Sequence, residues 1–208
     1  MDEPSDADLW RQAASGSDAA FGALFERHAS AVYNYCFRRV ANWAAAEDLM
    51  AATFLEAWRR RDEVQLTRES IRPWLLGVAT NLIRNDWRSR RRRDAALRRV
   101  ALTTLTSIDG PADEIAAKLE DERRMKELLH QLSLIPTDQQ EVIALVLWSE
   151  LSYEEAATTL GVPIGTIKSR LSRARRRLME LAEHSGHNRS EENALARASE
   201  TQPREAEG

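Results

Sequence analysis

Two dense runs of basic side chains are the residues in this sequence best suited to a chemical task. The first run contains Arg84, Arg88, Arg90, Arg91, Arg92 and Arg93, and the second contains Lys168, Arg170, Arg173, Arg175, Arg176 and Arg177. Guanidinium and ammonium groups donate hydrogen bonds to phosphate oxygens, so such runs favour contact with a polyanion. The chain has 30 basic and 33 acidic residues and a net charge of -3, so its total charge is nearly balanced. The two basic runs show that positive and negative side chains are nevertheless segregated along the sequence.

The second basic run lies in a pattern of helix, turn and longer helix over Leu151–Leu178. Ser152 and Glu155 have the spacing of a capping box that begins a short helix, and Gly161 suits its end. Pro163 suits the first turn of the longer helix. A short helix, a glycine turn and a basic helix are typical of a helix-turn-helix, whose second helix enters the DNA major groove.

The longer helix has one apolar stripe, and its other faces are free for DNA. The stripe consists of Ile167, Leu171, Ala174 and Leu178, and the other faces carry Thr166, Lys168, Ser169, Arg170, Ser172, Arg173, Arg176 and Arg177. Arginine and lysine suit phosphates and guanine edges, and serine and threonine suit either bases or phosphates. The alternative is a solvated basic helix, but no acidic residue stands between Lys168 and Leu178, whereas solvated faces usually mix signs.

Apolar residues at helical spacing predict three amphipathic helices before residue 93. Their stripes run over residues 21–36, 46–60 and 71–87, with a polar loop over residues 61–70. The third helix carries Trp74 and Trp87 beside the first arginine run, and aromatic rings next to cations suit unstacked nucleic-acid bases. The alternative is that at least one of these tryptophans packs in a core and that the arginines form a solvated helix end.

The sequence thus predicts an all-α fold of two small helical domains joined by a flexible linker. We expect an N-terminal segment at 1–17, a helical bundle at 18–93, a linker at 94–117, a second domain at 118–183 and a disordered polar tail at 184–208. In the second domain, Pro136 closes one helix, and Thr137 with Gln140 has the spacing of a capping box for the next.

The segment from Leu151 to Arg175 closely resembles region four of extracytoplasmic-function (ECF) sigma factors of the sigma-70 family. Its letters are LSYEEAA and, after two threonines, LGVPIGTIKSRLSRAR. In that family, region four recognises the promoter −35 element. The resemblance implies that six residues lie at or near the DNA, namely Thr166, Lys168, Ser169, Arg170, Ser172 and Arg173. Which of them contact bases does not follow from the sequence.

Two segments of the first domain resemble region two of the same family. AEDL from Ala46, followed by TF and AW, resembles the helix that docks on the clamp of core RNA polymerase, which implies contacts by Glu47, Asp48, Leu49, Phe54 and Trp58. The family often has a glutamine and an acid where this chain has Ala51 and Ala52, so we expect the contact to be weaker or shifted to Glu47, Asp48 and Glu56.

The segment RPWLLGVATNLIRNDWR from Arg72 resembles the −10 recognition helix of the family. Asn81 and Asp86 fall on the family's characteristic asparagine and aspartate, and the resemblance implies −10 contacts by Asn81, Arg84, Asp86, Arg88 and Arg91. In the family, the loop before this helix captures a flipped base, and here that loop is about residues 61–72.

The resemblance implies a transcription initiation factor whose partners are core RNA polymerase, promoter DNA and an anti-sigma factor. The linker is too short to hold the middle domain of primary sigma factors. One rival reading is an ordinary helix-turn-helix repressor or activator that uses only Leu151–Leu178. Another is a DNA-processing enzyme, but the sequence has no convincing nucleophile, phosphate loop or catalytic cluster, so we expect no enzyme and no cofactor.

The remaining candidates point to ordinary roles. His184 and His187 have metal-ligand spacing but lie in the polar tail without a cysteine nearby, so we expect no metal site. Cys36 is the single cysteine and fits a packed thiol among apolar residues. Met1–Asp8 lacks the features of a secretory signal, and no apolar run approaches about 20 residues, so we expect a cytosolic protein. The acidic tail after Glu183 either shields the basic helices or keeps the chain soluble.

Overall fold

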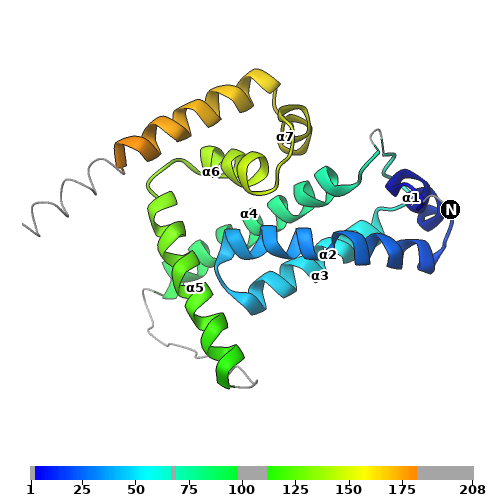
Figure 1. Cartoon of the computed structure of the whole chain (residues 1–208), viewed down its shortest axis with the longest axis horizontal. Coiled ribbons are helices and arrows are strands. Elements are labelled where there is room, and N and C mark those ends of the chain that lie inside the picture. Colours follow the sequence, from blue (N-terminus) through cyan, green and yellow to red (C-terminus); the bar gives the residue numbers. More distant parts are fainter. Residues whose placement is uncertain (1–2, 67–68, 98–111, 182–208) are drawn as a thin grey trace, which may run out of the picture.

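The chain folds into two helical units that lie side by side (Figure 1). The computed structural model describes residues 3–66, 69–97 and 112–181, with the backbone alone for residues 90–97 and 112–117. The described residues contain no strand, which confirms the predicted all-α class. The first unit consists of α1 (Asp6–Ala14), α2 (Asp18–Val40), α3 (Trp43–Arg59) and α4 (Arg72–Leu97). The second consists of α6 (Thr137–Ile143), a π-helical turn (Ala144–Trp148), α7 (Tyr153–Leu160) and a C-terminal helix at 164–181.

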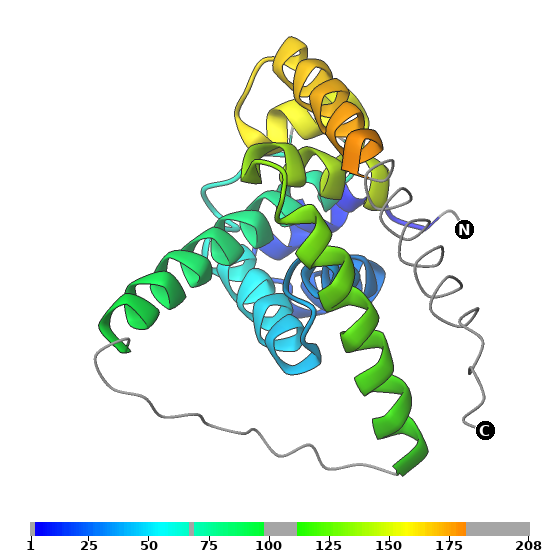
Figure 2. The same cartoon turned by 90° about the vertical axis from the view of Figure 1, so that its left-hand side faces the viewer.

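Helix α5 (Ala112–Leu132) leads into the second unit and also contacts the first. Glu122 is 5% exposed and accepts hydrogen bonds from Trp43 N (2.9 Å) and Asn42 Nδ2 (3.3 Å) at the start of α3. Figure 2 shows α4 and α5 diverging from the body of the molecule toward opposite sides. Both helices extend into the segment predicted as a linker at 94–117, and residues 98–111 lie outside the described part of the chain.

The core of the first unit is made by the apolar stripes predicted for α2, α3 and α4. Their buried members include Leu24, Val32, Tyr35, Phe54, Ile71, Leu75 and Ile83, and Leu76, which was not in the predicted stripe, is buried with them. Cys36 is fully buried among them, and burial raises the pKa of its thiol to about 12, as expected for a packed cysteine. The predicted loop between α3 and α4 is also present, over residues 60–71, of which 67 and 68 are not described.

Helix α1 is an element that the apolar periodicity did not predict. It begins after Ser5, whose side chain accepts a hydrogen bond from the backbone N–H of Asp8 (3.2 Å). Leu9, Trp10 and Ala13 form its buried face and join the core of the first unit. The helix is nine residues long and largely polar elsewhere, so its sequence pattern is short and weak.

The capping residues of the second unit follow the prediction in one helix and contradict it in another. At α7, Glu155 N donates to Ser152 Oγ (3.2 Å) and Ser152 N donates to Glu155 Oε2 (2.8 Å), which confirms that capping box. At α6, the capping box of Thr137 and Gln140 was wrong. Pro136 occupies the N-cap and offers no side-chain hydrogen bond, while Gln140 Nε2 donates to the carbonyl of Ile135 (2.9 Å).

Among the described residues, three hydrogen bonds and one ion pair join the two units along α4 and α2. Three end on main-chain carbonyls: Arg38 Nη1 to Trp148 O (2.9 Å), Arg72 Nη2 to Ser149 O (2.5 Å) and Thr159 Oγ1 to Pro73 O (3.0 Å). The fourth is an ion pair between Arg84 and Glu141. Gly77 allows α4 and α7 to approach closely, because a Cβ at this position would lie 3.4 Å from the carbonyl oxygen of Thr159. We call this the closed arrangement.

Two tyrosines on α2 give a matched test of buried hydroxyl groups. The Tyr35 hydroxyl donates to Thr80 Oγ1 (2.7 Å), because the Thr80 hydroxyl donates its own proton to the carbonyl of Leu76. The Tyr33 hydroxyl is buried with no hydrogen-bond partner among the described residues. We therefore expect Tyr35→Phe to lower the free energy of unfolding by about 1 kcal/mol and Tyr33→Phe to leave it unchanged or raise it. Urea unfolding of both variants measures this, and equal losses would contradict it.

Candidate nucleic-acid interface

The C-terminal helix is positioned as the second helix of a helix-turn-helix. Its predicted stripe packs inward, with Ile167, Leu171 and Ala174 each at most 2% exposed. Gly161 ends α7 with a φ of 65°, a left-handed conformation that glycine adopts without strain, and the chain then turns into the longer helix. The buried stripe fixes which faces of the helix meet solvent, so the basic residues are held outward by the core.

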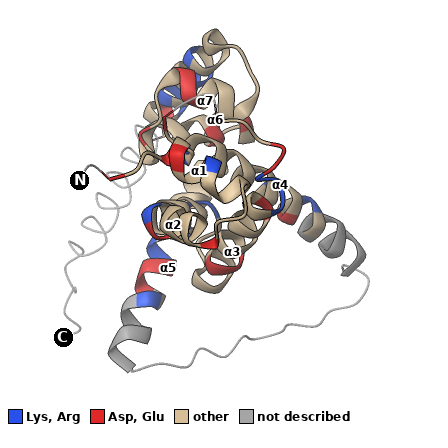
Figure 3. Ribbon diagram, turned by 90° about the vertical axis from the view of Figure 1, so that its right-hand side faces the viewer, with Lys and Arg blue, Asp and Glu red and all other residues tan. Residues whose placement is uncertain are grey.

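The predicted −35 residues lie on those outward faces. Lys168, Ser169, Ser172, Arg173, Arg176 and Arg177 are exposed, and Thr166 and Arg170 are half-buried. Residues 168–178 contain no acid. Helix α5, in contrast, alternates acidic and basic residues along its described length (Figure 3). Arg170 also makes an internal contact, because its Nε lies 2.9 Å from Asp138 Oδ2 on α6. This ion pair adds a contact between the helix and α6 to the packing of the buried stripe.

The predicted −10 residues of α4 fall into different environments. Asn81 and Arg88 are exposed, Asp86 is half-buried, and the side chain of Arg91 lies outside the described part of the chain. Arg84 is held by Glu141, with Nε to Oε1 at 2.6 Å and Nη2 to Oε2 at 2.5 Å. Glu141 is only 2% exposed, and its hydrogen bonds raise the pKa of Arg84 above the ordinary value. In the closed arrangement, the Arg84 guanidinium is therefore already hydrogen-bonded to Glu141 of the second unit.

Both tryptophans of α4 are half-buried and packed. The Trp74 ring lies 5.6 Å from the Trp10 ring of α1, centroid to centroid. Trp87 lies under the guanidinium of Arg39, at 4.8 Å from the ring centroid. Arg39 is 3% exposed, and its Nε and Nη2 have no hydrogen-bond partner among the described residues. Both tryptophan rings thus pack partly against the core, as the alternative interpretation of these residues expected.

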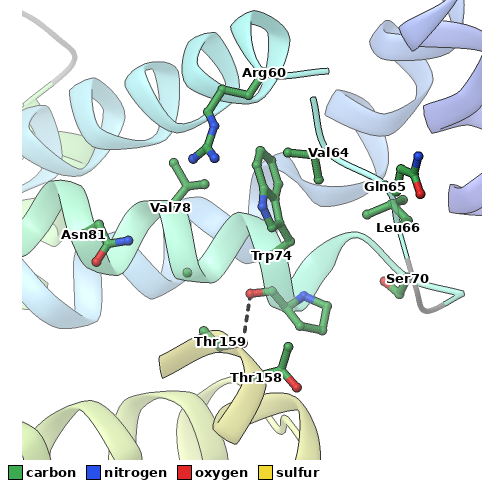
Figure 4. A pocket seen from close by; sticks show the side chains of 12 residues that line it. Arg60, Val64, Gln65, Leu66, Ser70, Trp74, Val78, Asn81, Thr158 and Thr159 are labelled. Carbon is green, nitrogen blue, oxygen red and sulfur yellow. Dashed lines mark hydrogen bonds between the residues drawn. The ribbon is translucent and has the colours of Figure 1, made fainter. Parts of the chain in front are cut away.

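A pocket of about 240 Å³ lies where the loop between α3 and α4 meets α4 (Figure 4). Its walls come from the loop, from α4 and from the first helix of the helix-turn-helix, and they include Arg60, Val64, Gln65, Leu66, Ser70, Trp74, Val78, Asn81, Thr158 and Thr159. In Figure 4, the Trp74 indole points toward Arg60 and Val64, and Thr159 approaches the start of α4 from the opposite side. The pocket coincides with the loop for which base capture was predicted.

The predicted polymerase-binding residues on α3 do not share one surface. Glu47 and Asp48 are exposed, Leu49 and Trp58 are half-buried, and Phe54 is 4% exposed within the core. Phe54 packs against the rings of Phe21 and Phe25, so it holds α3 against α2 and does not face solvent. Leu55, which was not among the predicted residues, is 51% exposed on the same helix. Leu55 follows Glu47 and Ala51 at intervals of four, so helical spacing from the predicted acids could have found it.

The described residues offer neither a metal site nor a membrane span. They contain no group of three or more histidine, cysteine, aspartate or glutamate side chains that could hold a metal ion. No described helix is both long and apolar enough to cross a bilayer. His184 and His187 lie outside the described residues.

Two family models match the chain. The first, "Sigma-70 region 2", matches residues 24–93, and the second, "Sigma-70, region 4", matches residues 125–178. The ECF RNA polymerase sigma factor SigL of Mycobacterium tuberculosis is 34% identical over 80% of this chain and 90% of SigL. The RNA polymerase sigma factor CnrH of Cupriavidus metallidurans is 32% identical over 86% of this chain and 95% of CnrH.

Two solved structures share the fold. CnrH in complex with the cytosolic domain of CnrY superposes with a TM-score of 0.65 at 28% identity, covering 87% of this chain and 99% of CnrH. The sigma factor RpoE in complex with the anti-sigma factor NepR from Bartonella quintana superposes with a TM-score of 0.58 at 29% identity, covering 78% of this chain and 96% of RpoE.

The ion pair between Arg84 and Glu141 leads to a prediction about the closed arrangement. Glu141→Gln keeps the side-chain shape but removes the charge, and a hydrogen bond to a charged group contributes roughly 1.5–3 kcal/mol. We expect the two units to separate more often, so that small-angle X-ray scattering gives a larger radius of gyration. Glu127→Gln is the matched control, because Glu127 is exposed on α5. An equal radius for the two variants would contradict the prediction.

Proposed function

This chain belongs to the ECF group of the sigma-70 family, transcription initiation factors that direct RNA polymerase to promoters, and we propose that it divides promoter recognition between its two units. The second unit reads the −35 element as duplex DNA. The first unit docks on core RNA polymerase and holds the opened −10 strand.

The exposed basic face of the C-terminal helix is the observation that carries the −35 assignment. Lys168 and Arg173 are exposed on the faces that the buried stripe leaves to solvent, where a major groove can receive them. Ser169 and Ser172 lie between them and can bond phosphates or base edges. Arg170 is half-buried beside Asp138, so its main role is to orient the helix.

The pocket beside Trp74 supports the −10 assignment. A base that leaves the duplex loses its stacking, and an aromatic wall with polar groups nearby offsets that loss. Trp74 supplies the ring, and the exposed amide of Asn81 supplies hydrogen-bonding groups beside it. Arg88 is exposed farther along the same helix and suits the phosphates of the captured strand.

Binding energy alone drives promoter opening in this proposal, so the chain acts without being an enzyme. The exposed face of α3, with Glu47, Asp48 and Leu55, docks on the polymerase. Polymerase and DNA contacts then offset the cost of unstacking the −10 bases, and no nucleotide is hydrolysed by this chain.

The closed arrangement must open for this function. Thr158 and Thr159 of the second unit line the −10 pocket, and Glu141 forms an ion pair with Arg84. A DNA strand on α4 would displace both contacts. Two tethered modules gain avidity only when their spacing fits the target, so initiation depends steeply on the distance between the promoter elements.

An anti-sigma factor is a further partner. The related RpoE is known in complex with the anti-sigma factor NepR, and the RpoE fold covers most of this chain. A protein that covered the basic helix or the exposed face of α3 would block promoter or polymerase binding.

Run-off transcription tests the proposal. Core RNA polymerase is mixed with genomic fragments in the presence and absence of this protein, and new transcript ends are mapped. We expect discrete start sites only when both proteins are present, with two sequence elements upstream at constant spacing. Absence of initiation, with retardation of duplex DNA by the protein alone, would instead indicate an ordinary helix-turn-helix regulator.

A lysine substitution separates phosphate contact from base reading in the −35 duplex. Lys168 is exposed and carries a point charge, so Lys168→Ala should weaken binding of the polymerase complex to all −35 sequences by a similar factor. The slope of log affinity against log salt should fall by about 0.9, the value for one lost phosphate contact. Lys118→Ala on α5 is the control, with no expected change in slope. A loss confined to one base pair would contradict a phosphate contact.

A further inference from the structure

Helix α1 precedes the segment that matches the family model, yet it contacts the wall of the −10 pocket at both ends of the α3–α4 loop. The match begins at residue 24, and α1 spans Asp6–Ala14. Two of its side chains, Asp6 and Trp10, are 5% and 3% exposed. Neither was singled out by the sequence, and neither lines the pocket itself.

Asp6 holds the end of the loop where α4 begins. Its Oδ2 accepts hydrogen bonds from Ser70 Oγ (2.9 Å) and from the backbone N–H of Ile71 (3.0 Å). Ser70 Oγ in turn accepts from the backbone N–H of Arg72 (3.2 Å), so the carboxylate of α1 caps α4 from a distance.

The Asp6 carboxylate is itself firmly held by α2. Arg27 Nη1 donates to its Oδ1 (2.7 Å), and His28 Nε2 lies 2.6 Å from its Oδ2. Burial alone would raise the pKa of Asp6, but the hydrogen bonds from Arg27, Ile71 and Ser70 outweigh it and lower that pKa. The group therefore stays ionised and keeps accepting at neutral pH.

Trp10 holds the other side of the loop. Its indole Nε1 donates to the carbonyl of Val64 (2.8 Å), and its ring packs on Trp74. Val64 and Trp74 both line the pocket, and so does Ser70, the partner of Asp6. Asp6 and Trp10 thus each bond directly to a residue of the pocket wall.

We propose that Asp6 and Trp10 are positioning residues that hold the first-unit wall of the pocket, at Val64, Ser70 and Trp74, in the shape that accepts an unstacked −10 base once Thr158 and Thr159 have moved away. The inference rests on the proposed function of that pocket. Ordering a loop costs conformational entropy. When the contacts of α1 order the pocket wall during folding, DNA binding does not have to supply that free energy again. Loss of either contact therefore weakens capture of the base more than it weakens the other contacts of the promoter complex.

The test uses the complete polymerase complex and single-stranded oligonucleotides of the −10 element mapped by run-off transcription. Each base of the element is removed in turn to leave an abasic site, and the loss of affinity is measured. With the natural chain, removing the captured base should cost roughly 5- to 150-fold, which corresponds to ~1–3 kcal/mol of stacking. Trp10→Phe keeps the ring but loses the bond to Val64, and Asp6→Asn keeps the shape but loses the charge.

In both variants we expect weaker binding of the intact oligonucleotide and a smaller abasic penalty at that one position, by roughly threefold or more. Asp8→Asn is the matched control for Asp6→Asn, because half-buried Asp8 lies on the same helix but bonds Ser5 and Arg11 rather than the pocket wall, and it should leave the penalty unchanged. Affinity for the −35 duplex should be the same in all variants. Thermal unfolding identifies a variant that fails to fold, and the milder Trp10→Phe then decides.

The possible outcomes distinguish the positioning role of Asp6 and Trp10 from the proposed function of the pocket. Equal loss of affinity for every oligonucleotide, with an unchanged abasic penalty, would overturn the positioning role and leave the proposed function intact. A natural chain that initiates transcription but shows no position-specific abasic penalty would overturn the assignment of the pocket, and the positioning role with it. Failure of run-off transcription would overturn the proposed function itself.

Discussion

Helix α4 packs against two partners with different requirements, and the arrangement of the whole molecule follows from this constraint. One face buries Leu75, Leu76 and Ile83 in the first unit, which anchors the helix permanently. Another face meets the second unit through hydrogen bonds, an ion pair and the close backbone approach at Gly77, beside buried apolar residues that form one cluster across both units. Apolar burial is costly to reverse, whereas hydrogen bonds can be exchanged with water or DNA at small net cost. In the proposed function, the first unit therefore stays intact, and the closed arrangement with its polar contacts is the part that changes.

The fold was largely predictable from the sequence because its helices are long and strongly patterned. The stripe at Ile167, Leu171 and Ala174 and the capping box at Ser152 were both predicted correctly from local spacing. Helix α1 escaped because it is short, and the proposed cap at Thr137 failed because Pro136 already fixes the chain direction there. Local spacing indicates where a helix can begin, but it does not decide between competing caps.

The candidate site was less predictable than the fold, because its key contacts join residues far apart in the chain. Arg84 and Glu141 are separated by 57 positions, and Asp6 and Ile71 by 65. A periodic pattern showed that Phe54 lies on an apolar stripe but not that the core would cover it, leaving Leu55 outside. Residue types indicated which side chains suit DNA, and only the packing showed which of them are occupied by a neighbouring helix.

The contacts between the two units also differ in how they constrain evolution. Arg38, Arg72 and Thr159 each bond a main-chain carbonyl, and every amino acid offers that acceptor at positions 148, 149 and 73. Substitution at those three acceptor positions leaves the hydrogen bonds possible. The ion pair of Arg84 and Glu141 requires two particular side chains, so a change in one favours a compensating change in the other. Related chains that keep the closed arrangement should therefore show covariation at positions 84 and 141, which the three carbonyl contacts do not require at positions 73, 148 and 149.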